Sequence, residues 1–152
     1  AFDPLLTAGA RNYWKSHNLS NLPDGLIDLA VDAVGHLPTD QSEIFLAALG
    51  GATMRPGAGD MAYAQRDARF VVNVHGRWED PADDARGIAW ARAFFEAAAP
   101  FASGGVYVNF MTGDEGDRIP AAYGANYPRL ARVKRRYDPD NLFAVNQNIT
   151  PA

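Results

Sequence analysis

The sequence predicts an α+β fold: a mainly antiparallel sheet with helices packed on one face. Strand-like and helix-like hydrophobic patterns alternate along the 152 residues, which is typical of a sheet covered by helices. The clearest strand, residues 69–78, alternates strictly between apolar and polar side chains. Such a strand has one buried and one polar face, so the helices would lie on one side of the sheet. The polar side would either meet water or cover a binding site.

The first two thirds of the chain contain five expected elements. The stretch 23–37 repeats apolar residues at helical spacing between two prolines, and the longer stretch 81–99 has the same period. A Gly-Gly pair would end the strand-like residues 43–49. In chain order we expect a strand at 11–17, a helix at 23–37, a strand at 43–49, a strand at 69–78 and a helix at about 81–99.

The last third adds a strand and a helix. Residues 106–111 alternate, so in a strand Tyr107 and Asn109 would share one face and the apolar residues between them would point to the core. The remaining expected elements are an acidic turn at 112–117, a helix at about 125–137, a helix-ending turn at 138–141 and an extended tail at 142–149.

Composition limits the classes of function. The formal net charge of −4 gives no general attraction to nucleic acid. No run approaches the ~20 apolar residues that a membrane helix needs, so neither nucleic acid nor membrane is an expected partner. The absence of cysteine excludes disulfides, thiolate metal sites and Cys-linked flavin, and favours a reducing compartment such as the cytoplasm. The excess of arginine over lysine and the abundance of alanine favour a bacterial source.

Four blocks in the last third carry the strongest signal, because their order and spacing are far more specific than any one of them. They read Tyr107-Val-Asn109-Phe110, then Tyr123-Gly-Ala-Asn-Tyr-Pro-Arg-Leu130, then Val133-Lys-Arg-Arg-Tyr-Asp-Pro-Asp-Asn-Leu-Phe143, and finally Asn146-Gln-Asn-Ile149. This pattern resembles the C-terminal signature of the berberine-bridge-type FAD-linked oxidases. Similarity to that family's substrate domain extends over nearly the whole chain, which corresponds to roughly the last third of a full member.

The resemblance implies a function. Members of the family oxidise an alcohol, a sugar or a related small molecule by hydride transfer to FAD. By this resemblance Tyr107 is the catalytic tyrosine, and Asn109 and Tyr123 contact the flavin, while no metal site is implied. Residues 1–104 would be a portion of the substrate domain and residues 105–152 the berberine-like C-terminal segment, packed together as one globular unit.

Two departures from the family pattern bear on the mechanism. Gln65-Arg66 stands where the family usually has His-Arg, and the strand-like residues 45–49 offer no carboxylate, although some relatives place one near the substrate there. A tyrosine of ordinary pKa, near ~10, is a poor base at neutral pH and needs a nearby cation or hydrogen-bond donor. Arg69 and Arg77, on the polar face of the 69–78 strand, are the candidates.

Other patterns are interpreted as structural. Residues 57–62 match a dinucleotide-binding pattern, but too few residues follow for the helix that such a site requires, so a loop is expected. The basic residues at 129–136 are interpreted as a solvated or domain-contacting helix face. His17 and His36 are expected at the surface, whereas His75 is a candidate for the pocket.

The chain starts Ala-Phe-Asp-Pro without an initiator methionine, so we expect it to be part of a longer polypeptide. It would need an FAD-binding domain in cis or in trans, and alone it is expected neither to retain FAD nor to turn over. The alternative is a non-catalytic interaction module that binds a partner chain, a separate FAD domain or another copy of itself. An exposed apolar patch where the FAD-binding domain would sit would favour a missing partner.

Overall fold

The computed structural model describes residues 8–57 and 59–152, so the Ala-Phe-Asp-Pro start and Ala58 lie outside the described residues. Three strands form one antiparallel sheet in the order β1-β3-β2: β1 (Arg11–Leu19), β2 (Glu43–Ala48) and β3 (Phe70–Trp78). The central strand β3 pairs His75 with Trp14 of β1 and with Glu43 of β2. The predicted α+β fold with a mainly antiparallel sheet is confirmed.

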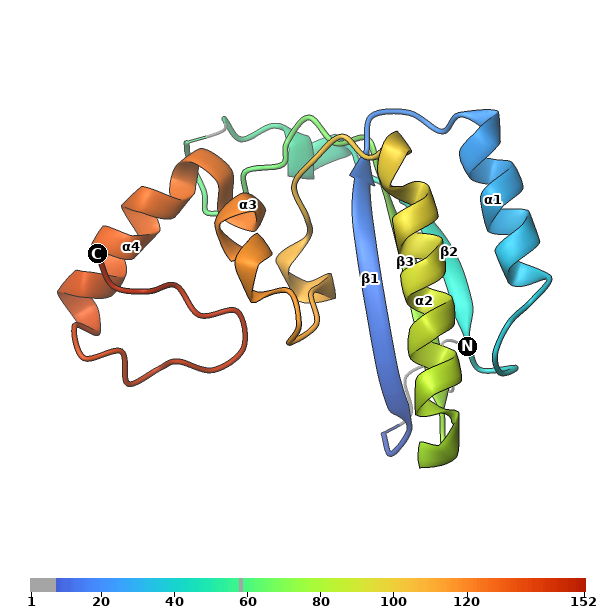
Figure 1. The fold of residues 1–152 in the computed structure, drawn as a ribbon. Coiled ribbons are helices and arrows are strands. Elements are labelled where there is room, and N and C mark those ends of the chain that lie inside the picture. The colour runs from blue at the N-terminus through green and yellow to red at the C-terminus, as the bar shows by residue number, and fades with distance from the viewer. Residues whose placement is uncertain (1–7, 58) are drawn as a thin grey trace.

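Two helices cover one face of this sheet, as Figure 1 shows. They are α1 (Asp24–Val34) and α2 (Asp84–Ala98). Leu26 of α1 and Ala91 of α2 are fully buried and share the main core with Val72 and Val74 of β3. α1 ends three residues earlier than expected, directly before Gly35, because glycine is a poor helix former.

Both faces of β3 are buried. On the predicted polar face, Asn73, His75 and Arg77 are only 1%, 3% and 5% exposed. Their polar atoms have partners: His75 Nε2 lies 2.8 Å from Asn12 Oδ1, and Arg77 Nε donates to Gln41 Oε1 at 3.2 Å. Buried polar groups are tolerated when they are hydrogen-bonded in this way. The polar face is therefore covered, not open to water.

The predicted strand at 106–111 is absent. Tyr107 is followed by a single 3₁₀ turn, Val108–Phe110, and the segment pairs with none of the three strands. Val106 and Met111 are instead buried in a small separate core with Ala122. Alternation over six residues favours a strand only where a sheet edge is free to pair with it, and this segment lies against the sheet face, where Phe110 contacts Phe45 of β2.

Two helices follow: α3 (Ile119–Tyr123) and α4 (Tyr127–Tyr137). α4 begins two residues later than expected and ends where the sequence predicts. The buried carboxylate of Asp138 accepts hydrogen bonds from the backbone N–H groups of Leu142 (2.7 Å) and Phe143 (3.1 Å), which turns the chain after the helix. The remaining 3₁₀ turns are Gly51–Met54, Pro81–Asp83, Ala99–Phe101, Gly116–Arg118 and Gly124–Asn126.

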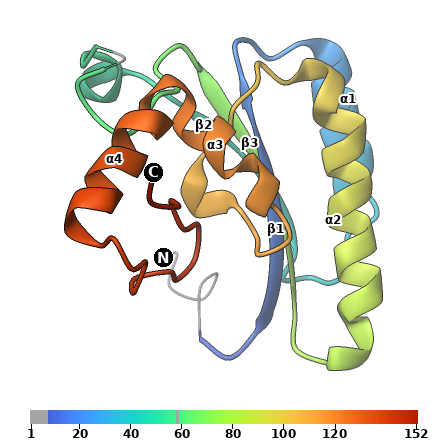
Figure 2. The ribbon, with the colours of Figure 1, turned by 60° about the vertical axis from the view of Figure 1, so that its left-hand side comes forward.

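The helices thus lie in two groups on either side of the sheet. Figure 2 shows α1 and α2 against one side, and α3 and α4 on the other. Within the part of the chain that the structure describes, none of these helices combines the length and the apolar character that crossing a bilayer would require.

Candidate active site

A cavity of about 670 Å³ lies against the sheet face opposite α1 and α2. Val71 of β3 lines this cavity, whereas the next residue, Val72, points to the helical core. β1 contributes Asn18 and β2 contributes Phe45 and Ala47, which are on the same face as Val71. The loop between β2 and β3, the segment 107–110 and α3 form the other walls. This volume is in the range of small-molecule sites.

Tyr107 lines the cavity and is held by Asn109. The side-chain amide of Asn109 donates a hydrogen bond to the Tyr107 hydroxyl oxygen at 2.9 Å, while Asn109 itself is exposed. Phe110 was expected on the opposite face, but the 3₁₀ turn brings its ring to 5.0 Å from that of Tyr107, edge to face. The site therefore has an aromatic wall of Tyr107 and Phe110, with Asn109 at its rim.

Tyr123 also lines the cavity, from the last residue of α3. Gly124 follows it in the left-handed region, with φ of 51°. The Gln65 side chain donates to the Ala121 carbonyl at 3.1 Å and so ties the β2–β3 loop to α3. The structure thus brings Tyr107 and Tyr123 into one cavity, while Asn109 contacts Tyr107 from outside it.

The cation at this cavity is Arg66, which the sequence argument did not single out for this role. Its guanidinium lies 4.8 Å from the centroid of the Tyr63 ring, and Tyr63 in turn contacts Tyr107 edge to face at 6.1 Å. Arg69 and Arg77 are not among the residues that line the cavity. Arg66 is the arginine of Gln65-Arg66, at the position where the family that the sequence resembles usually has His-Arg, and this resemblance is the sequence signal that could have indicated it.

Few of the side chains that line the cavity could accept a proton from a substrate. Among the described residues that line it there is no carboxylate and no histidine, which agrees with the missing carboxylate at 45–49. Burial raises the pKa of Tyr63, although the charge of Arg66 opposes this. Tyr63 therefore stays protonated. Tyr107 is the phenol whose oxygen receives a hydrogen bond from a neighbouring amide.

Two of the three histidines, His17 and His75, do not lie where the sequence predicts. His17 is 7% exposed, stacks on Phe95 at 4.1 Å and lies 2.9 Å from the Phe95 carbonyl oxygen, so the surface assignment is wrong. His75 is buried on the cavity side of the sheet but does not line the cavity. His36 is exposed, as expected.

The other sequence patterns form no second site in the part of the chain described. No helix lies between Gly59 and β3, which confirms a loop instead of a dinucleotide-binding turn. No group of three or more metal-ligating side chains gathers among the described residues. The acidic residue Asp114 is instead paired with Lys15 and Arg92.

The chain resembles known proteins in sequence and in fold. A family model described as berberine and berberine like matches residues 106–150, the segment that carries Tyr107, Asn109 and Tyr123. The FAD-linked oxidoreductase YgaK of Bacillus subtilis is 30% identical over 116 residues, which cover 76% of this chain and 26% of the relative. The structure of BBE-like protein 28 from Arabidopsis thaliana has the same fold, with a TM-score of 0.85 at 20% identity, covering 95% of this chain and 34% of that one. The chain belongs to the berberine bridge enzyme-like family.

A further structure resembles this berberine bridge enzyme-like chain at higher identity. A glycopeptide hexose oxidase in complex with teicoplanin has a TM-score of 0.83 at 26% identity, covering 94% of this chain and 33% of the oxidase. The berberine bridge enzyme-like chain therefore spans about a quarter to a third of the length of these relatives.

Proposed function

We propose that this chain forms the substrate side of the active site of an FAD-dependent oxidoreductase that oxidises an alcohol, a sugar or a related small molecule. The observation that carries the proposal is the cavity on the sheet face opposite α1 and α2. Tyr107 lines this cavity and receives a hydrogen bond from Asn109. The names of the relatives support redox chemistry on FAD, and one of them is a hexose oxidase.

The residues around the cavity fit one side of a flavin ring. Tyr107 and Phe110 offer aromatic surface, and Asn109 is an exposed amide with hydrogen-bonding capacity beyond its bond to Tyr107. The described residues include no glycine-rich turn that opens a long helix, as pyrophosphate binding requires. We therefore assign flavin contacts to Asn109 and Tyr123 and leave the phosphates to another domain. When bound, FAD supplies the acceptor for the hydride that leaves the substrate carbon.

Tyr107 is assigned as the base that takes the proton of the substrate hydroxyl onto its phenolic oxygen. Two features support this role. The amide of Asn109 donates to that oxygen, and Arg66 brings a positive charge to the same cavity. As the base, Tyr107 acts in its phenolate form, and a hydrogen-bond donor and a cation are the partners that such a base requires.

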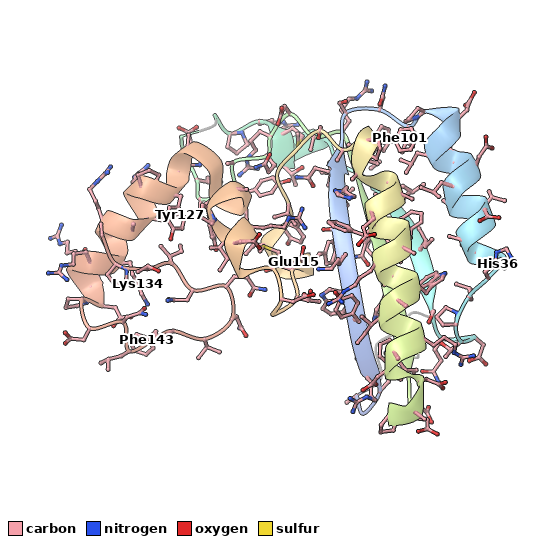
Figure 3. All side chains as sticks on the ribbon, in the orientation of Figure 1. His36, Phe101, Glu115, Tyr127, Lys134 and Phe143 are labelled. Atoms are coloured by element: carbon pink, nitrogen blue, oxygen red, sulfur yellow. The ribbon has the colours of Figure 1, made fainter. Side chains whose placement is uncertain are left out.

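An exposed apolar surface supports a partner domain. Large apolar side chains on α4 and the segment after it are strongly exposed: Tyr137 by 73%, Leu142 by 80%, Phe143 by 77% and Val145 by 78%. Figure 3 labels Phe143 on the loop that follows α4, away from the sheet. Exposed apolar patches mark interaction sites, so we assign this surface to an FAD-binding domain, in cis or in trans. A homo-oligomer is the alternative occupant.

Two measurements test the proposed function. The purified chain alone is expected to show no visible flavin absorption after desalting. Joined to or mixed with its FAD-binding domain, it is expected to bind FAD and to bleach the flavin band anaerobically with a substrate from a panel of alcohols and sugars. Tyr107→Phe should slow this bleaching by about 10²- to 10⁴-fold, the usual contribution of an acid–base group.

Tyr127→Phe provides the matched control, since Tyr127 lies on α4 and does not line the cavity. It should bleach at the wild-type rate. Flavin that survives desalting of the isolated chain would contradict the division of FAD contacts between two domains. Equal rates for the Tyr107 and Tyr127 variants would contradict the assigned base.

A further inference from the structure

The cavity walls are almost entirely apolar. Phe45, Ala47 and Val71 of the sheet face Val108, Phe110 and Ala122 across it. Among the described residues that line the cavity, the single charged one is Arg66. Its guanidinium is partly engaged, because Nη1 donates to the Thr53 carbonyl and the group lies over the Tyr63 ring, while Nε is buried without a partner. A molecule bound here would therefore meet hydrocarbon on most of its surface.

Asn18 is the exception in the sheet wall. It comes from β1, pairs in register with Val71 and lines the cavity. Its side chain is 1% exposed, and neither its amide nitrogen nor its amide oxygen has a hydrogen-bond partner. A buried amide without partners is unfavourable, and most buried polar groups in proteins are paired. Asn18 borders the cavity, so a group that enters the cavity can pair with the buried amide once the side chain turns toward it.

We infer that Asn18 determines substrate specificity, by hydrogen-bonding an oxygen of a neutral substrate whose ring system is otherwise apolar. A carbonyl oxygen would accept from the Asn18 amide, and a hydroxyl would also donate to its oxygen. A free sugar fits poorly, because most of its hydroxyl groups would lie unpaired against hydrocarbon. This inference rests on the proposed function and narrows its substrate class to oxygenated, ring-bearing apolar alcohols.

The test uses two small probes with the same rings, 1-tetralone and tetralin, and needs no flavin. Each is titrated into the ¹⁵N-labelled chain and followed by the side-chain amide signals of asparagine. The ketone is expected to bind about five- to tenfold more tightly than the hydrocarbon, since one net hydrogen bond is gained. The Asn18 amide signals should shift with 1-tetralone and not with tetralin.

Variants make the assignment specific. Asn18→Leu should remove the preference for the ketone while keeping the affinity for tetralin. Ser16→Ala is the matched control: Ser16 lies two residues earlier on the same strand face, and its hydroxyl is also buried without a partner, but it does not line the cavity. It should keep the preference. The wild-type amide signals give the same information if Asn18→Leu does not fold.

Three outcomes would overturn the inference: equal affinities for the two probes, a ketone preference that survives in Asn18→Leu, or no binding of either probe. Glucose that binds as tightly as 1-tetralone would also contradict it. These results are separable from those of the flavin experiment. Flavin reduction that depends on Tyr107 but not on Asn18 would contradict only the role of Asn18 in specificity. Probe binding without any flavin reduction would contradict the proposed oxidoreductase activity.

Discussion

At the scale of single residues, two adjacent glycines lie just before the segment 107–110, which forms one wall of the cavity. Gly104 and Gly105 both have positive φ, at 87° and 67°, a conformation that strains any residue with a Cβ. They differ in their surroundings. A Cβ on Gly105 would lie 2.2 Å from the Gln65 side chain, whereas one on Gly104 would meet nothing within 4 Å. Gln65 is the residue that bonds to the Ala121 carbonyl of α3.

We therefore predict that Gly105→Ala is more destabilising than Gly104→Ala. Both lose about 1 kcal/mol or more to backbone strain, but only Gly105→Ala must also displace Gln65. Chemical denaturation of the two variants measures the difference directly. Equal losses of unfolding free energy would mean that Gln65 moves aside without cost and does not tie the loop to α3.

Single residues also differ in how well the sequence predicts their place in the site. Tyr107, Asn109 and Tyr123 lie in short blocks whose internal spacing is readable, and two of them do line the cavity. Asn18 and Arg66 were not predicted as cavity residues. Asn18 reaches the cavity because β1 pairs with β3 in one particular register, and a single sequence does not fix such long-range pairing.

At the scale of elements, α2 lies close against the sheet at Gly87. A Cβ there would lie 2.4 Å from the Trp78 ring of β3, and Trp78 is 2% exposed, with its indole N–H bonded to Asp84 at 2.6 Å. The tryptophan thus has little room to move. Glycine at this position sets the distance between helix and sheet.

Gly87→Ala is expected to destabilise the fold by about 1–3 kcal/mol, as overpacked cores do, despite the better helix propensity of alanine. Gly25→Ala in the first turn of α1 is the control, because its Cβ would lie 3.3 Å from the outer edge of the Phe101 ring. It should change stability by less than about 0.5 kcal/mol. A Gly87 variant as stable as the Gly25 variant would show that α2 can shift freely on the sheet.

Elements with a regular period and an available neighbour were predictable. All three strands and α2 lie within a few residues of the expected positions, because burial on one side imposes a repeat of two or 3.6 residues. The segment 106–111 has the strand repeat but anchors Val106 and Met111 in their own small core. Its six residues contain no signal that distinguishes a paired strand from a crossing segment.

At the scale of the whole molecule, two buried histidines and the more exposed Asp114 connect the sheet to the segments that cover its two faces. His17 of β1 lies under α2, and burial lowers its pKa, with the Phe95 carbonyl opposing the shift. His75 of β3 lies on the cavity side, and burial lowers its pKa too, with Glu43 opposing. Asp114 is held against β1 and α2 by Tyr13, Lys15 and Arg92. Partial burial opposes the shift, but hydrogen bonds from Thr112, Tyr13 and Arg92 and the charge of Lys15 hold the pKa of Asp114 well below its ordinary value.

These shifts predict a loss of stability in acid, in two stages. A histidine whose pKa is lowered by folding stabilises the native state above its unfolded pKa of 6.5, and that contribution is lost as pH falls toward the folded pKa. The carboxyl of Asp114 behaves likewise below its unfolded value of 3.8. Unfolding free energy should therefore decline from about pH 6.5 downward because of the histidines, and again below about pH 4.

Denaturation curves at a series of pH values measure both stages, and two pairs of variants separate them. His17→Gln should reduce the upper stage to the part that His75 contributes, whereas His36→Gln should leave it unchanged, because the His36 side chain is 76% exposed. Asp114→Asn should flatten the lower stage, whereas Asp117→Asn, at an exposed carboxylate on the same loop, should not. A free energy of unfolding that stays constant from neutral pH to about pH 5 would contradict this prediction. It would mean that the buried histidines take up protons without loss of stability. The contact between α2 and the sheet would then not depend on a neutral His17.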